Sequence, residues 1–149
     1  MIKIGIFAQI YEFMSEYKSK TVIVNAAPMA LFNRFTDLEG LVASVPEQQR
    51  KDISIDGDSL RVSYGGFTIA VKIIEKTPFS RIRVVDIEAP FHFTVTINLN
   101  PGEMPLQTAL DIELDADLNF MMKAMVGSHI QEFLDKAVTS IATGGGIIG

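Results

Sequence analysis

The two histidines of this sequence are the side chains best suited to proton transfer near neutral pH, and they lie in different kinds of segment. His129 falls among apolar residues spaced three and four apart, which places it on the apolar side of a helix. There it could orient a ligand or move a proton; the alternative is a wet or hydrogen-bonded histidine at the helix rim. His92 lies between Phe91 and Phe93, and this alternation predicts a solvent-facing strand position. Two histidines on different elements without a spaced partner form no metal-binding pattern.

Acidic residues recur at every second position shortly before the last predicted helix, at Asp111, Glu113, Asp115 and Asp117. Paired carboxylates can catalyse proton transfer or bind a hard cation. Here they alternate with apolar residues, so we expect them to form a solvated outer strand face. Arg81 and Arg83 alternate in the same way on an earlier strand, and cross-strand ion pairs with such acids are expected.

Other patterns that carry chemistry are missing from the sequence. Ser128 precedes His129 directly, which is not the arrangement of a catalytic serine and its base. Gly65-Gly66 lacks the lysine and hydroxyl residue of a phosphate-binding loop. The chain has no cysteine, so thiol nucleophiles, thiolate metal sites and disulfides are excluded. We therefore assign no catalytic residue, metal ion or cofactor.

The charge and the N-terminal segment bear on partners and location. A net charge of −5 over 149 residues argues against nucleic acid, which is bound mainly through lysine and arginine. The apolar run Ile4–Ile10 is interrupted by Gln9 and is far shorter than the about 18 residues of a membrane span. It also lacks a clear cleavage site of small residues. We expect residues 1–14 to be an N-terminal extension, residues 144–149 to be a flexible tail, and the protein to be cytoplasmic without stable membrane insertion.

The order of the predicted elements is distinctive. The β-branched stretch Lys20–Ala26 predicts a first strand. Met29–Val45 predicts two short helices, the second of them capped by Asp37. From Ile53 to Asp115, six stretches alternate apolar and polar residues, and turn residues such as Asp56-Gly57-Asp58 separate them. Because the connections are short, neighbouring strands should pair in order and antiparallel.

The last segment changes to helical spacing and predicts one long helix over about Leu118–Ala142, capped by Asp117. One broad apolar arc of this helix should face the sheet. The arc contains Leu118, Met122, Met125, Val126, His129, Ile130, Phe133, Ala137 and Ile141. The sequence thus predicts an α+β domain over residues 15–143, with about seven strands and two short helices after the first.

This order resembles the helix-grip fold of the START-like (SRPBCC) superfamily, which includes polyketide cyclases, the birch-pollen allergen family and lipid-transfer domains. The local features that carry the resemblance are Val24–Pro28, Phe32–Leu38 and Leu118–Met122. The chain looks most similar to small uncharacterised bacterial members. The resemblance implies a curved sheet wrapped round the C-terminal helix, with an apolar ligand held between them.

We therefore predict a module that binds a hydrophobic or amphipathic small molecule, such as a lipid or a polyketide-like compound. The predicted cavity lining is Phe32, Phe35, Tyr64, Phe93, Val95, Ile112, Met122, Met125, Val126 and His129. Methionine is flexible and polarisable, which suits a cavity that accepts varied apolar shapes.

Two alternatives stay open. One is a cyclase- or hydratase-type enzyme in which His129 or Tyr64 handles a proton. That reading requires two polar side chains facing inward together, and only isolated candidates are found, which favours a binding module. The other is an interaction protein without a ligand, for example a homodimer.

Overall fold

Alternation of apolar and polar residues produces six consecutive strands between Ile53 and Asp117, as predicted. The computed structural model describes residues 14–64 and 66–144, so most of the predicted N-terminal extension and tail lies outside the described residues. Each of the six strands pairs antiparallel with the next. They are β3 (Ile53–Asp56), β4 (Ser59–Tyr64), β5 (Phe67–Thr77), β6 (Arg81–Glu88), β7 (Phe93–Pro101) and β8 (Thr108–Asp117).

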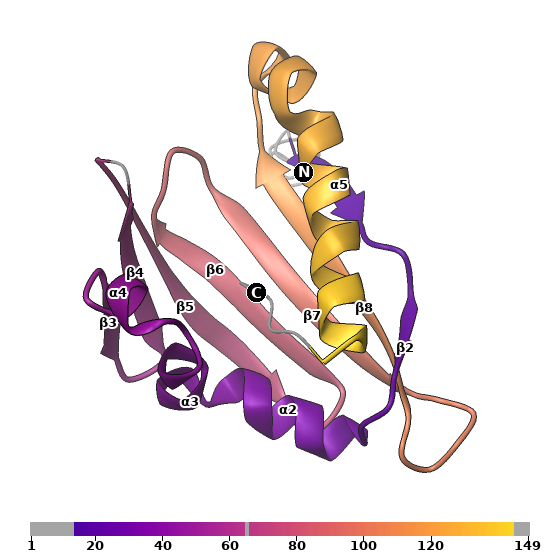
Figure 1. Ribbon diagram of the computed structural model, residues 1–149. Helices are drawn as coiled ribbons and strands as arrows, with labels where there is room; N and C mark the ends of the chain where they lie inside the picture. The colour runs from indigo at the N-terminus through magenta and orange to yellow at the C-terminus, as the bar shows by residue number, and fades with distance from the viewer. Residues whose placement is uncertain (1–13, 65, 145–149) are drawn as a thin grey trace, which may run out of the picture.

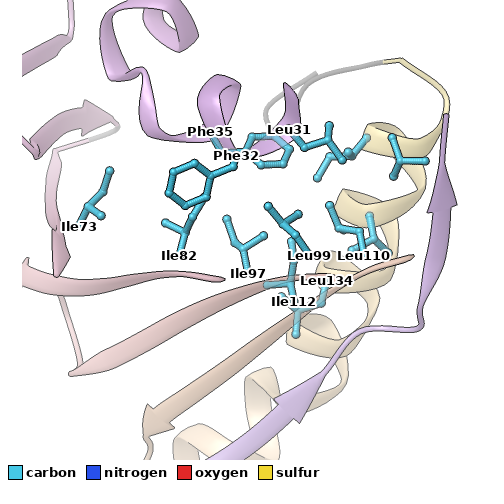
Figure 2. Close-up of a cluster of buried hydrophobic side chains, with 13 residues drawn as sticks. Leu31, Phe32, Phe35, Ile73, Ile82, Ile97, Leu99, Leu110, Ile112 and Leu134 are labelled. Carbon is cyan, nitrogen blue, oxygen red and sulfur yellow. The ribbon is translucent and has the colours of Figure 1, made fainter. Parts of the chain in front are cut away.

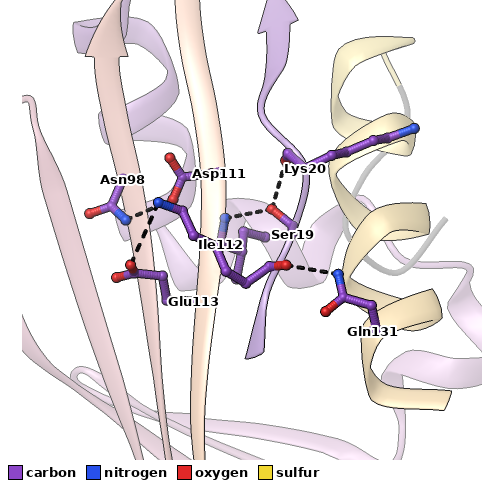
Figure 3. A network of polar contacts seen from close by, with 8 residues as sticks. Ser19, Lys20, Asn98, Asp111, Ile112, Glu113 and Gln131 are labelled. Carbon is purple, nitrogen blue, oxygen red and sulfur yellow. Dashed lines mark hydrogen bonds and ion pairs between the residues drawn. The ribbon is translucent and has the colours of Figure 1, made fainter. Parts of the chain in front are cut away.

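The start of the sheet differs from the prediction. Instead of one strand over Lys20–Ala26, the structure has β1 (Met14–Lys18) and β2 (Val22–Val24), and both pair with β8. The break occurs at Ser19, whose hydroxyl accepts the N–H of Ile112 at 2.9 Å and so replaces a main-chain partner (Figure 3). The described residues therefore form a sheet of eight strands rather than about seven. Because β1 begins at Met14, that residue belongs to the sheet and not to an extension.

Short helices follow β2 and cover one end of the sheet (Figure 1). Helix α2 (Pro28–Thr36) begins with proline at its first position, where the missing N–H costs nothing. Helix α3 (Leu38–Ala43) is capped by Asp37, whose carboxylate accepts the Gly40 N–H at 3.0 Å. This cap was predicted. A third helix, α4 (Glu47–Arg50), was not; it begins directly after Pro46, beyond the predicted helical stretch Met29–Val45.

The long C-terminal helix α5 (Phe120–Ala142) confirms the predicted helix but begins two residues later. Its cap is Asn119, whose side chain accepts the Met122 N–H at 2.8 Å. Asp117, the predicted cap, is the last residue of β8, and its N–H binds the His92 carbonyl at 2.8 Å. Strand pairing therefore extends to the residue that the sequence pattern assigned as the helix cap.

The core lies where α2 and the C-terminal half of α5 meet one face of the sheet, here called the inner face (Figure 2). Each large apolar side chain buried there contributes about 1.5–3 kcal/mol to stability. The strands contribute Ile73, Ile82, Ile97, Leu99, Leu110 and Ile112; the helices contribute Leu31, Phe32, Phe35, Leu134, Val138 and Ile141.

Candidate functional site

Strand register aligns the inner-face side chains in rows across the sheet. The row formed by Ile82, Ile97 and Ile112 is buried beneath the helices. The next row, one step farther along the strands, contains Tyr17, Leu114, Val95 and Val84. These four, here called the half-buried row, pack against the core but stay partly accessible. The apolar side chains of the inner face thus become more accessible to solvent with increasing distance from the core.

Helix α5 lies over one side of this face, against β1, β2 and β8 (Figure 1). Hydrogen bonds connect one flank of the helix to the end of β1 and the residues that follow it. Gln131 donates from its amide nitrogen to the Lys18 carbonyl at 2.7 Å (Figure 3), and Asp135 accepts the Lys20 N–H at 2.8 Å. These bonds hold the helix at the edge of the inner face, so its other flank is turned away from the connection between β1 and β2.

That second flank, here called the apolar flank, carries Met122, Val126 and Phe133. With 3.6 residues per turn, Val126 and Phe133 lie on nearly the opposite side of the helix from Gln131 and Asp135. Met122 and Val126 are half-buried, and Phe133 is 61% exposed. The buried residues of α5 begin at Leu134. Its N-terminal half therefore leaves the half-buried row partly accessible.

Tyr17 is the unusual member of the half-buried row. Its hydroxyl oxygen is buried and has no hydrogen-bond partner among the described residues. A Cβ placed on Gly127 of α5 would lie 3.1 Å from that oxygen, so the absence of a side chain at Gly127 makes room for it. The phenol therefore reaches from β1 to the backbone of the helix.

An acid–histidine pair occupies the end of the inner face beyond the half-buried row. Asp86, whose side chain is 8% exposed, accepts the Phe93 N–H at 2.8 Å and binds Nδ1 of His92 at 2.8 Å. Burial acts to raise the pKa of Asp86, but the bonds from Phe93 and His92 outweigh it and hold that pKa below its usual range. The same bond, followed by the charge of Asp86, raises the pKa of His92. The imidazole is 85% exposed, as predicted, so the pair fixes the connection between β6 and β7 at the surface.

The acidic strand pattern lies on the outer face of β8 but is less solvated than predicted. Asp111 is buried and accepts a bond of 2.9 Å from the Asn98 amide. Burial, followed by the charges of Glu16 and Glu113, raises the pKa of Asp115. Within residues 14–64 and 66–144, no three histidine or acidic side chains are grouped so that they could hold a metal ion.

A shallow cleft of about 830 Å³ runs along the flank of α5 that carries Gln131 and Asp135. It is lined by residues with polar side chains, among them Lys20, Ser128, Gln131, Asp135 and Thr139. This cleft lies on the other side of the helix from the predicted apolar lining.

Comparison with solved structures gives the fold a wider context. Norcoclaurine synthase from Thalictrum flavum superimposes with a TM-score of 0.66 at 15% identity, over 87% of this chain and 83% of that one. Its complex with dopamine and hydroxybenzaldehyde gives 0.62 at 15%, over 79% and 78%. An uncharacterized protein from Bacillus thuringiensis gives 0.60 at 10%, over 88% and 97%.

The chain has the helix-grip fold. The predicted fold is thereby confirmed. No protein-family model and no curated protein matches the sequence. None of the helices among the described residues is long and apolar enough to cross a membrane.

Within the helix-grip fold, the predicted lining residues whose side chains the structure describes fall into three groups. Phe32, Phe35 and Ile112 belong to the packed core. Phe93, Val95, Met122 and Val126 are half-buried around the inner face beside the core. Met125 and His129 are exposed, Met125 to 68%. The side chain of Tyr64 lies outside the described part of the structure.

The predicted apolar arc of α5 is wrong at its edges. Phe133, Met125 and His129 were expected to face the sheet, yet all three are exposed. Helical spacing determines which residues share a side of the helix. How the helix is turned on the sheet is determined by the hydrogen bonds of Gln131 with Lys18 and of Asp135 with Lys20, which leave this part of the arc exposed. Tyr17 was missed, although the alternation Ser15, Glu16, Tyr17, Lys18 is a strand signal that could have placed it inward.

Proposed function

We propose that this protein binds a hydrophobic or amphipathic small molecule between the half-buried row of the sheet and the apolar flank of α5. The observation that carries the proposal is the partial cover of the inner face. Four side chains of one row remain partly accessible, and the helix above this side of the face carries the apolar side chains of Val126 and Phe133. Apolar walls with few polar groups are typical of small-molecule sites.

The fold comparison supports the binding of a small molecule, without indicating its location. Norcoclaurine synthase has been solved with dopamine and hydroxybenzaldehyde, so one protein of this fold takes up aromatic molecules. At 15% identity its ligands and its chemistry do not transfer to this chain. Catalysis is a weaker proposal here, because His129 is exposed and the ring of His92 faces solvent.

The first test is native mass spectrometry of the freshly purified full chain, followed by denaturation and extraction. A released apolar molecule would support the proposal and define the ligand class. A mass of two chains without any bound molecule would favour the interaction protein instead.

A binding assay with naphthalene, followed by its fluorescence, tests the location. Phe133→Ser should weaken naphthalene binding about tenfold, because burial of a phenylalanine side chain contributes about 1.5–3 kcal/mol. Leu106→Ser, in the connection between β7 and β8, is the matched control, since Leu106 is also strongly exposed but lies away from the apolar flank. Equal weakening by both variants would refute the proposed location.

A further inference from the structure

Three large apolar side chains are exposed in the first two turns of α5. Phe120 is 91% exposed, and Met121 and Met125 are exposed to 70% and 68%. These three side chains, here called the exposed patch, lie on the side of the helix that carries Gln131 and Asp135, because successive residues are about 100° apart. The exposed patch is thus separate from the apolar flank and from the proposed site. Exposed apolar side chains that are grouped in this way are typical of interaction surfaces.

The start of β1 lies beside the exposed patch. The two hydrogen bonds between α5 and the end of β1 join later residues of the helix to later residues of the chain, so strand and helix run in the same direction. Tyr17 lies against Gly127. Met14 is three residues before Tyr17, about 10 Å along the strand, and this length corresponds to about seven residues along the helix. Counting back from Gly127 therefore places Met14 next to the turn that carries Phe120 and Met121.

Residues 1–13 join the described chain at this point, since Met14 is the first residue of β1 and pairs with Asp117 just before α5. Only two of these thirteen residues are charged. Their large aliphatic and aromatic residues include Ile2, Ile4, Ile6, Phe7 and Ile10. Thirteen residues extend to at most about 43 Å, whereas Phe120 and Met125 are only about 8 Å apart along the helix axis. The segment is therefore long enough to reach the whole patch.

We infer that residues 1–13 dock on the exposed patch of the same chain through their apolar side chains. A segment tethered at Met14 is present at the patch at an effective concentration of about millimolar, far above that of a second copy in dilute solution. A net charge of −5 disfavours binding to a negatively charged membrane surface. The same chain is therefore the favoured occupant, and burial of apolar surface drives the docking. This inference does not depend on the proposed function.

A single tryptophan tests the docking, because the chain has none of its own. In the full chain carrying Phe7→Trp, acrylamide should quench the tryptophan much less than in the same chain unfolded in urea. Adding Phe120→Ser and Met125→Ser should each lower the equilibrium constant of docking about tenfold or more, because burial of such a side chain contributes at least the about 1.4 kcal/mol of a factor of ten. Quenching should then rise toward that of the unfolded chain. Phe133→Ser, at an exposed residue of the same helix on the apolar flank, is the matched control and should leave quenching unchanged.

The second variant changes the segment and not the helix. Ile10→Ser in the Phe7→Trp chain should also raise quenching, with the circular dichroism of the folded chain unchanged, so the test does not depend on how α5 tolerates serine. Quenching as strong as in urea before any further substitution would overturn the inference, as would protection that both the patch substitutions and Ile10→Ser leave intact. Protection that is lost on dilution would overturn it in favour of a second copy. Protection that appears only with phosphatidylcholine vesicles would overturn it in favour of a membrane surface.

Discussion

The contact between Tyr17 and Gly127 can be tested without any ligand, through the stability of the chain. Glycine inside a helix costs about 1 kcal/mol relative to alanine, so Gly127→Ala would ordinarily stabilise α5. Here the new Cβ would lie 3.1 Å from the Tyr17 oxygen, closer than ordinary contact. We predict that the phenol suppresses most of the gain.

Removing the hydroxyl should restore the gain. In Tyr17→Phe the nearest remaining ring atoms would lie 3.8 and 3.9 Å from the new methyl group, which is ordinary van der Waals contact. Gly127→Ala should therefore stabilise the Tyr17→Phe chain by about 1 kcal/mol and the wild-type chain by clearly less. The coupling energy between the two sites should be about 0.5–1 kcal/mol, within the range for residues in contact.

Urea unfolding of the four chains at one pH measures this coupling from the midpoints, provided that the slopes agree. Ala124→Gly is the matched control, since Ala124 is an exposed residue of the same helix. It should cost about 1 kcal/mol in both backgrounds. Equal stabilisation by Gly127→Ala in both backgrounds would show that the Tyr17 hydroxyl does not hinder a side chain at position 127. The predicted coupling between the two positions would then be refuted.

Two further predictions concern charge. Asp115→Asn should raise the free energy of unfolding at pH 7 by about 0.2–1 kcal/mol, because Asp115 faces Glu16 directly across the strands. The pKa of Asp115 is raised in the folded chain, so the gain should shrink as pH falls through that pKa; a gain independent of pH would contradict this. The bond to Asp86 raises the pKa of His92 above its ordinary 6.5. The contribution of this bond to the stability of the chain is therefore complete below pH 6.5 and is lost as the pH rises through the pKa of the folded state. Urea unfolding from pH 6 to 9 should show this decline in the wild type and not in His92→Ala, and an NMR titration of the ring at or below 6.5 would disprove it.

The strands and the long helix were predictable because their signals are local. Residues such as Val95 and Ile97 alternate with polar neighbours, and the side chains of a strand necessarily alternate between its faces. Asp37 was recognisable as a cap because a cap needs only a carboxylate and an N–H three residues later. These interactions act within a few residues, so the chain reveals them without knowledge of its distant contacts.

The first strand was harder because its ends depend on a distant partner. Ser19 divides it by binding the N–H of Ile112, which is 93 positions farther along the chain. Asp117 has the chemistry of a cap but is taken up by β8, whose pairing extends to its end. In both cases a long-range hydrogen bond overrode a local preference.

The sequence by itself determined the α+β class, the order of the elements and which face of each strand is apolar. Only the tertiary structure decided how α5 is rotated over the sheet, because this rotation depends on Gln131 and Asp135 binding the main chain at Lys18 and Lys20. That rotation leaves Met125 and His129 exposed and brings Gly127 against Tyr17. Helical spacing gives the angle between residues of one helix, whereas the angle between helix and sheet is set by contacts between segments more than 100 residues apart.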